Sequence, residues 1–197
     1  MAEQKAFLVN ADRCIGCYTC AMACKSYNGL ESDVAWRQIY PLAENHFPYD
    51  DRAFYSLACN HCAAPVCEAV CPTGAYKKRR DDGIVIHDQD ACIGCTNCIR
   101  ACPFGAPKYN KKLKKAEKCS LCHHRLDAGL APACIQACPV RAIELVDLNT
   151  LNREMFDQDT PEAPKLLETP PGFPDGEGLY PSVRFVLPTL PRMMIMR

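Results

Sequence analysis

Short apolar runs, separated by polar turn residues, mark the first 150 positions of this chain. Residues 7–9, 84–86 and 142–146 are β-rich runs of strand length. Asp82 and Gly83 form a hairpin-turn dipeptide between residues 75–78 and 84–86. The pattern therefore predicts short strands, with a hairpin over residues 75–86.

The helical signals are equally short. Residues 20–27 favour a helix that ends at Asn28 and Gly29, where a left-handed backbone is needed. Pro103 prevents a long helix after Cys102. Short helices interleaved with short strands predict an α+β fold.

The character of the chain changes after about residue 150. Residues 161–197 contain eight of the sixteen prolines and no cysteine. Such a segment is typical of irregular structure rather than of a packed core. We therefore expect residues 150–197 to form an extended, proline-rich tail that binds a partner. The partner would cover the apolar runs 183–187 and 193–196.

The sixteen cysteines fall into four groups of four. Groups one and three repeat the spacing C-x2-C-x2-C-x3-C at residues 14–24 and 92–102, which indicates a repeated structural unit. Groups two and four share a looser pattern, P-x-C-x3-C-P, at residues 65–72 and 132–139. In chain order the groups are Cys14, Cys17, Cys20 and Cys24; Cys59, Cys62, Cys67 and Cys71; Cys92, Cys95, Cys98 and Cys102; and Cys119, Cys122, Cys134 and Cys138.

Composition limits the chemistry of these thiols. In 197 residues, 23 Lys and Arg balance 23 Asp and Glu, so no net field favours nucleic acid or an acidic membrane surface. No apolar run has the length of a signal peptide or a membrane span, so we expect no export or membrane insertion by the chain itself. Cysteines without a secretory signal indicate metal binding rather than disulfides.

The spacing then selects the kind of metal centre. Zinc sites use two C-x2-C pairs for each ion, whereas C-x2-C-x2-C followed by a fourth cysteine is the spacing of two-cluster ferredoxins. Three cysteines of one loop can bind three irons of a cube, while the fourth, about one helical turn further on, points away from that cube. Sixteen thiolates thus predict four [4Fe–4S] clusters. A structural zinc-binding protein is the alternative from a different class.

A resemblance to a known family is carried by the stretches CIGCYTCAMACK, CNHCAAPVCEAVCPTGA, DGIVIHDQDACIGCTNCIRACPFGAPKYN and KCSLCHHRL. Over residues 5–146 the chain resembles the four-cluster iron–sulfur subunit (beta subunit) of dimethyl sulfoxide reductase-type molybdoenzymes. One departure is Lys25 after Cys24, where the other three groups have proline. Subunits of polysulfide, thiosulfate, nitrate and formate enzymes share the framework, so the terminal substrate stays open.

The order of the groups predicts two nested ferredoxin-like modules. Only the predicted hairpin separates groups two and three, which form an inner module over residues 51–107; groups one and four form a split outer module over residues 1–50 and 108–149. The resemblance supports this nesting and implies crossed ligand sets. The sets are Cys14, Cys17, Cys20 with Cys138; Cys119, Cys122, Cys134 with Cys24; Cys59, Cys62, Cys67 with Cys102; and Cys92, Cys95, Cys98 with Cys71.

Basic residues and histidines adjoin several of these cysteines. A lysine-rich run before group four is typical of a solvated face, but Lys118 adjoins Cys119 and is a candidate cofactor-binding residue, because a cation near a cluster raises its reduction potential. His61, His123 and His124 are expected to be neighbours of the site or surface residues, since the thiolate count is already complete.

The sequence contains no Walker loop, no G-x-S-x-G and no dinucleotide-binding fingerprint. The predicted function is therefore that of a non-catalytic electron-transfer subunit. The resemblance implies two partners, a molybdopterin-containing catalytic subunit and a quinone-reactive membrane anchor. It also implies membrane association through partners, on the cytoplasmic face or after folded export with a twin-arginine partner. The alternative within the same chemistry is a polyferredoxin-type subunit of a hydrogenase or formate dehydrogenase complex.

Overall fold

The computed structural model describes residues 3–41, 53–157, 166–170 and 172–187. The strands are β1 (Lys5–Asn10), β2 (Gln38–Pro41), β3 (Phe54–Leu57), β4 (Tyr76–Lys78), β5 (Val85–His87), β6 (Lys108–Asn110), β7 (Lys115–Glu117), β8 (Ile143–Asp147), β9 (Leu166–Leu167) and β10 (Arg184–Val186). The helices are α1 (Thr19–Asn28), α2 (Val66–Ala69), α3 (Asn97–Ala101), α4 (His123–Asp127), α5 (Ala133–Gln136) and α6 (Leu148–Asp157).

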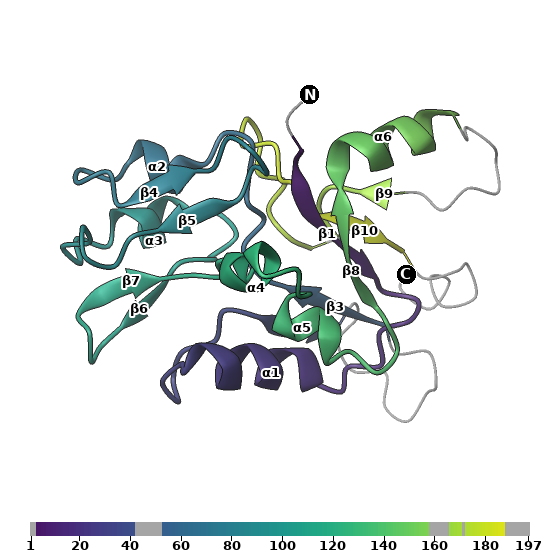
Figure 1. The fold of residues 1–197 in the computed structure, drawn as a ribbon, viewed down its shortest axis with the longest axis horizontal. Coiled ribbons are helices and arrows are strands. Elements are labelled where there is room, and N and C mark those ends of the chain that lie inside the picture. Colours follow the sequence, from purple (N-terminus) through teal and green to yellow (C-terminus); the bar gives the residue numbers. More distant parts are fainter. Residues whose placement is uncertain (1–2, 42–52, 158–165, 171, 188–197) are drawn as a thin grey trace.

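These elements divide between two ends of the molecule (Figure 1). One end, called the sheet end below, contains β1, β8, β9 and β10 together with α1, α5, α6 and the β2–β3 pair. The other, called the hairpin end, contains the β4–β5 and β6–β7 hairpins with α2 and α3. Helix α4 lies between them (Figure 1). The fold is therefore a mixture of short helices and short strands, as the sequence predicts.

The sheet end is built around β1, the second strand in the order β8-β1-β10-β9. Strand β8 pairs with β1 antiparallel, and β10 pairs with its other edge in parallel, with Leu8 opposite Arg184. Phe7 and Val9 in β1 are 3% and 0% exposed. A strand this apolar, paired on both edges and covered on its faces, forms the centre of the larger core.

The hairpin end has a smaller core. Its five buried residues are Cys67, Tyr76, Val85, Cys98 and Ala116, contributed by α2, β4, β5, α3 and β7. Two of the five are cysteines, and isolated two-stranded hairpins are only marginally stable in water. Packing alone therefore gives this end less support than the sheet end has.

The local predictions for the first 150 residues are confirmed. Strands β1, β5 and β8 cover the predicted apolar runs, and β4 pairs with β5 as a hairpin. Helix α1 ends at Gly29, whose φ of 60° is left-handed and whose N–H bonds the carbonyls of Lys25 and Ser26. Helix α3 ends before Cys102 and Pro103. These features depend on neighbouring residues, which is why the sequence carries them.

The expectation of an irregular, partner-covered tail is wrong for its described part. Helix α6 and strands β9 and β10 all belong to this segment. Val183 and Phe185, expected under a partner, are 4% and 1% exposed in the chain's own core. The physical reason is that β1 needs a partner on its second edge, and β10 supplies it. Residues 193–196 lie outside the described residues.

The same segment also holds the loop of group two. Backbone N–H groups of Ala63 and Ala64 donate to the carbonyls of Tyr180 and Leu179, at 2.9 and 3.1 Å. In return, Ser182 donates its N–H to the Asn60 carbonyl at 3.0 Å, and its hydroxyl donates to the His61 carbonyl at 3.0 Å. Residues 179–182 of this segment therefore hold the cysteine loop of group two in place.

The module boundaries expected at residues 51 and 108 do not match the packing. Strand β3 pairs with β2 and contributes Tyr55 to the larger core, so residues 54–57 belong to the sheet end. Hairpin β6–β7 belongs to the hairpin end, because Ala116 lies in the smaller core and the Gln89 side chain donates to its carbonyl at 2.8 Å. Cysteine spacing does not reveal these contacts, because they depend on residues outside the cysteine motifs.

Candidate metal centres

All sixteen cysteines lie in the described part of the chain, and all are free thiols. Helix α1 carries Cys20 and Cys24 and packs against α5, which carries Cys134. Helix α2, with Cys67, packs against α3, with Cys98. Groups one and four therefore meet at the sheet end, and groups two and three at the hairpin end.

The first C-x2-C turn of each group has the same backbone conformation. The residue before the second cysteine is left-handed in all four turns; these residues are Gly16, His61, Gly94 and Leu121, with φ of 68°, 45°, 73° and 54°. The conformation directs an amide to the first sulfur. His61 N–H lies 3.5 Å from Cys59 Sγ, and Leu121 N–H lies 3.4 Å from Cys119 Sγ. Amide donors favour the thiolate, which is the form that binds metal.

A second turn follows the last cysteine of groups two, three and four. Each of these cysteines is followed by proline, and the residue three positions after the cysteine is left-handed; these residues are Gly74, Gly105 and Arg141, with φ of 63°, 58° and 50°. The next amide points back to sulfur. Ala75 N–H donates to Cys71 Sγ and Ala142 N–H to Cys138 Sγ, both at 3.3 Å. Proline thus marks a turn that gives the fourth thiolate a backbone donor.

Group one departs from this pattern at Lys25. Because α1 continues through Lys25 to Asn28, proline is not tolerated there. The Asn28 amide, Nδ2, instead lies 3.6 Å from Cys24 Sγ. Burial raises the pKa of Cys24 to about 12, and nearby Arg37 opposes this shift. The departure therefore replaces a backbone donor with a side-chain donor and a cation.

At the sheet end the thiols of groups one and four influence one another. Burial raises the pKa of Cys14, and the thiols of Cys20, Cys138 and Cys17 raise it further. Burial likewise raises the pKa of Cys119, as do the thiols of Cys24 and Cys134. Groups one and four are also linked through Cys134 of group four, whose thiol raises the pKa of Cys20 in group one.

At the hairpin end four thiols line one cavity. Its wall includes Cys59, Cys62, Cys67, Cys102 and Lys118. Burial, together with the thiols of Cys59, Cys102 and Cys67, raises the pKa of Cys62 to about 12. These four cysteines form one of the sets predicted from the sequence.

The remaining thiols of the hairpin end lie around its small core. Cys71 and Cys92 pack against the cluster that contains Cys98. Burial raises the pKa of Cys98, and Cys92 and Cys95 raise it further, whereas the Tyr76 hydroxyl, 3.3 Å from its sulfur, lowers it. Cys95 is exposed, as is Cys17 at the other end of the molecule.

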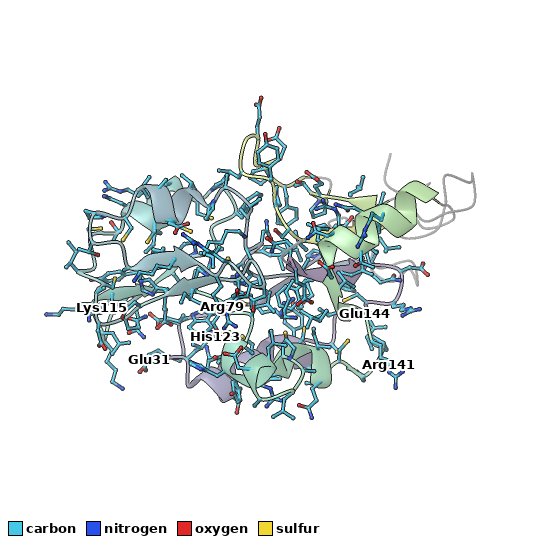
Figure 2. All side chains as sticks on the ribbon, turned by 45° about the horizontal axis from the view of Figure 1, so that its top comes forward. Glu31, Arg79, Lys115, His123, Arg141 and Glu144 are labelled. Carbon is cyan, nitrogen blue, oxygen red and sulfur yellow. The ribbon has the colours of Figure 1, made fainter. Side chains whose placement is uncertain are left out.

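Lys118 differs from the other lysines of its run. It is 3% exposed, and its ammonium donates to the carbonyls of Val85 at 2.5 Å and Cys119 at 2.9 Å. It lines the four-thiol cavity, which contains group-two cysteines rather than Cys119. Figure 2 shows Lys115, by contrast, at the outer edge of the hairpin end, with Arg141 and Glu144 at the opposite end of the molecule.

Two buried polar side chains complete the surroundings of the thiols. His61 is 1% exposed; its Nδ1 accepts the Val85 N–H at 3.1 Å, and its Nε2 has no partner among the described residues. Arg37 is 2% exposed, and sequence reasoning missed it. It lies between groups one and two without adjoining a cysteine, so no local signal marks it.

The donor set fits iron–sulfur clusters. Soft thiolates select such clusters, and loop amides, a lysine and an arginine are placed to stabilise negative sulfur. The arrangement defines a ferredoxin-like iron–sulfur protein. The chain matches a 4Fe-4S dicluster domain over residues 51–148 and a 4Fe-4S binding domain over residues 5–26.

Curated relatives identify the family. The chain is 41% identical over 165 residues to the B component of the anaerobic dimethyl sulfoxide reductase of Escherichia coli, covering 80% of each protein. It is 33% identical over 173 residues to the B component of the sulfite dehydrogenase of Allochromatium vinosum, covering 77% of this chain and 72% of the relative. It is 29% identical over 190 residues to the arsenate respiratory reductase iron-sulfur subunit ArrB of Shewanella sp., covering 72% and 81%.

The chain therefore belongs to the iron–sulfur subunits of dimethyl sulfoxide reductase-type molybdoenzymes. The predicted family and function are confirmed: the chain is a non-catalytic electron-transfer subunit of an oxidoreductase complex. In the described residues, no helix is both long and apolar enough to span a membrane.

Proposed function

We propose that this subunit carries single electrons through four [4Fe–4S] clusters, bound in two nested modules. The observation that carries the proposal is the grouping of the thiols: one cavity is lined by Cys59, Cys62, Cys67 and Cys102, and Cys14 is influenced by Cys17, Cys20 and Cys138. When bound, the clusters would supply one-electron oxidation and reduction.

The proposed ligands are all sixteen cysteines, in the crossed sets that the sequence predicts. The sets are Cys14, Cys17, Cys20 and Cys138; Cys24, Cys119, Cys122 and Cys134; Cys59, Cys62, Cys67 and Cys102; and Cys71, Cys92, Cys95 and Cys98. Support for the second set comes from the thiols of Cys134 and Cys122, which both raise the pKa of Cys24. Helix packing supports the two modules, because α1 contacts α5 and α2 contacts α3.

The protein would contribute solvation of charge and exclusion of water. Backbone amides donate to the sulfurs of Cys59, Cys71, Cys119 and Cys138, which stabilises thiolates in buried surroundings. Buried Lys118 would place a positive charge at the cavity of group two and so favour reduction there. Differences in burial and charge would then give the centres different potentials.

The proposed partners are a molybdopterin-containing catalytic subunit and a quinone-reactive membrane anchor. The relatives are named as components of two reductases and a dehydrogenase, and one is named an iron-sulfur subunit, which supports a catalytic partner for this chain. Association with a membrane would come through the anchor.

Iron and acid-labile sulfide in the anaerobically purified chain test the cluster number. We expect about sixteen of each per chain, four for each cube, with visible absorption that dithionite bleaches. About eight of each would reduce the proposal to two clusters. Stoichiometric zinc in a colourless protein would remove it altogether.

Serine variants test the crossed sets. Cys24→Ser and Cys119→Ser are expected to change the same electron paramagnetic resonance signal, since both belong to one set. Cys14→Ser, which alters the adjoining set, is expected to change a different signal. If Cys14→Ser and Cys24→Ser change one common signal, the crossed assignment is wrong and each motif binds its own cluster.

A further inference from the structure

Arg37 is a buried cation without a carboxylate partner. It is 2% exposed, and none of the ion pairs among the described residues includes it. Removing a guanidinium from water is costly unless an opposite charge compensates. No aspartate or glutamate of the described residues therefore compensates the charge of Arg37.

One edge of the guanidinium is fixed by neutral groups. Nη1 donates to the Ser56 hydroxyl at 2.9 Å and to the Ser56 carbonyl at 3.2 Å. The planar group also lies over the Phe7 ring, 4.3 Å from its centre. Ser56 Oγ is in turn 3.4 Å from Cys20 Sγ, so the anchor of Arg37 itself adjoins a thiol.

The other edge of the guanidinium has no partner. Nε and Nη2 are buried donors that make no hydrogen bond within the described residues. Buried donors in native proteins almost always have an acceptor, and an arginine presents its donors as a rigid fork. Two free donors on one fixed side chain therefore point to an acceptor that the described part of the chain does not supply.

Several thiols lie near this arginine. The Phe7 ring beneath the guanidinium belongs to the larger core, which also contains Cys20, Cys119 and Cys134. Burial lowers the pKa of Arg37, but the thiols of Cys134, Cys119, Cys20 and Cys24 raise it, and the net direction is upward. Three of these four cysteines belong to the proposed set with Cys122, and Cys20 belongs to the proposed set with Cys14. Arg37 thus lies where two proposed cluster sites approach each other.

We propose that Arg37 is the shared counter-cation of the two cluster sites at the sheet end, and that its free Nε–H and Nη2–H donate to sulfur there. This inference rests on the proposed function. Reduction adds one negative charge to a site, so a buried cation makes reduction easier and raises the potential. Arg37 is a positioning residue that acts on the potential, and it is not a metal ligand.

The test is a redox titration of the intact complex, followed by electron paramagnetic resonance, for the wild type and Arg37→Gln. We expect the reduction equilibrium of the most affected sheet-end centre to weaken at least tenfold, which is a fall of about 59 mV for one electron. A smaller fall is expected at the neighbouring sheet-end centre. The two hairpin-end signals should keep their midpoints.

Two further variants separate buried charge from other effects. Arg13→Gln removes an exposed arginine beside Cys14, paired with Glu144 at 3.2 Å, and should shift the midpoints little because water screens its charge. Lys118→Gln removes the buried cation of the hairpin end and should lower the midpoint of a hairpin-end centre instead. The arginine and lysine variants therefore predict shifts at opposite ends of the molecule.

Iron and sulfide counts distinguish a failure of the proposed function from a failure of the proposed role of Arg37. A wild-type chain without clusters would contradict the proposed function. If Arg37→Gln keeps its full cluster content and the reduction equilibrium of each sheet-end centre changes less than threefold, the proposed role of Arg37 is overturned and the proposed function stands. If Arg37→Gln loses a cluster, Arg37→Lys decides: recovery of that cluster with a midpoint near the wild-type value supports the counter-cation, and continued loss contradicts it.

Discussion

The sheet end and the hairpin end support the same cysteine motif in different ways. Among the described residues, the larger core contains fifteen buried residues, four of them cysteines, and is centred on a strand paired on both edges, whereas the core of the hairpin end contains five, two of them cysteines. The turns around sulfur are nevertheless the same, with Gly16 and Gly94 at equivalent positions. Local turn chemistry thus fixes the shape of a metal-binding loop, while its stability depends on what lies behind it.

Removal of iron should reveal the largest difference in stability between the two ends. In the anaerobic protein, an iron chelator is expected to make residues 66–117 sensitive to proteolysis before the strands of the sheet end, because the small core cannot stabilise two hairpins alone. Hydrogen exchange followed by mass spectrometry measures the order of opening. Simultaneous opening of both ends, or earlier opening of β1 and β8, would contradict the comparison.

Phe185→Ala tests the support of the sheet end. Phe185 is 1% exposed and contacts the Tyr55 ring edge to face, with centres 5.6 Å apart. Truncating a buried phenylalanine should lower the free energy of unfolding by about 3–5 kcal/mol. The control is Met22→Ala on α1, where the side chain is 62% exposed and the expected change is under about 0.5 kcal/mol. Equal effects of the two variants in thermal or denaturant unfolding would show that β10 is not part of the core.

The two equivalent glycines provide a matched pair. A left-handed alanine costs about 1–2 kcal/mol, so Gly16→Ala and Gly94→Ala share that loss. A Cβ at Gly94 would also meet the Lys114 carbonyl oxygen, whereas one at Gly16 would meet the Phe54 ring at 2.8 Å, a side chain that can move. Gly94→Ala should therefore lower the midpoint of thermal unfolding more. If Gly16→Ala lowers the midpoint of thermal unfolding more than Gly94→Ala does, this contrast between a backbone neighbour and a movable side chain is wrong.

The smallest expected effect concerns the link between the two ends. Arg79, after β4, donates to both carboxylate oxygens of Asp127 in α4, at 2.8 and 3.1 Å (Arg79 is labelled in Figure 2). This hydrogen-bonded pair is exposed, so Asp127→Asn should lower the midpoint of thermal unfolding only slightly. The change should leave the iron content unaltered.

The pH dependence of this link has a defined sign. Hydrogen bonds from Arg79 hold the pKa of Asp127 below its ordinary value, so the pair stabilises the folded state above the unfolded pKa of about 3.9 and the contribution is lost as pH falls through the folded pKa. The difference between wild type and Asp127→Asn should therefore shrink in acid. A difference that grows as pH falls would contradict this account.

The sequence predicts local features well because they depend on nearby residues. The β4–β5 hairpin, the end of α1 at Gly29 and the end of α3 before Cys102 and Pro103 all follow from residues within about five positions. The family resemblance is confirmed by the relatives.

The sequence does not predict contacts between distant segments. Strand β10 pairs with β1 across more than 170 positions, and proline-rich composition around it suggests no strand at all. Arg37 is equally hidden, since its thiol neighbours come from α1, α5 and the loop before α4. Lys118 is recognised beside Cys119, but which cavity its side chain lines depends on the fold.

The pairing of β1 with β10 also sets an order for biosynthesis. Strand β1 leaves the ribosome more than 170 residues before β10, so the second edge of β1 stays open while all sixteen cysteines emerge. Residues 179–182, which fasten the loop of Cys59 and Cys62, also emerge late. In a nascent chain the loop of Cys59 and Cys62 therefore stays unlatched until residues 179–182 have been translated. A chain that stops before these residues would carry all sixteen cysteines without the contacts that fasten this loop.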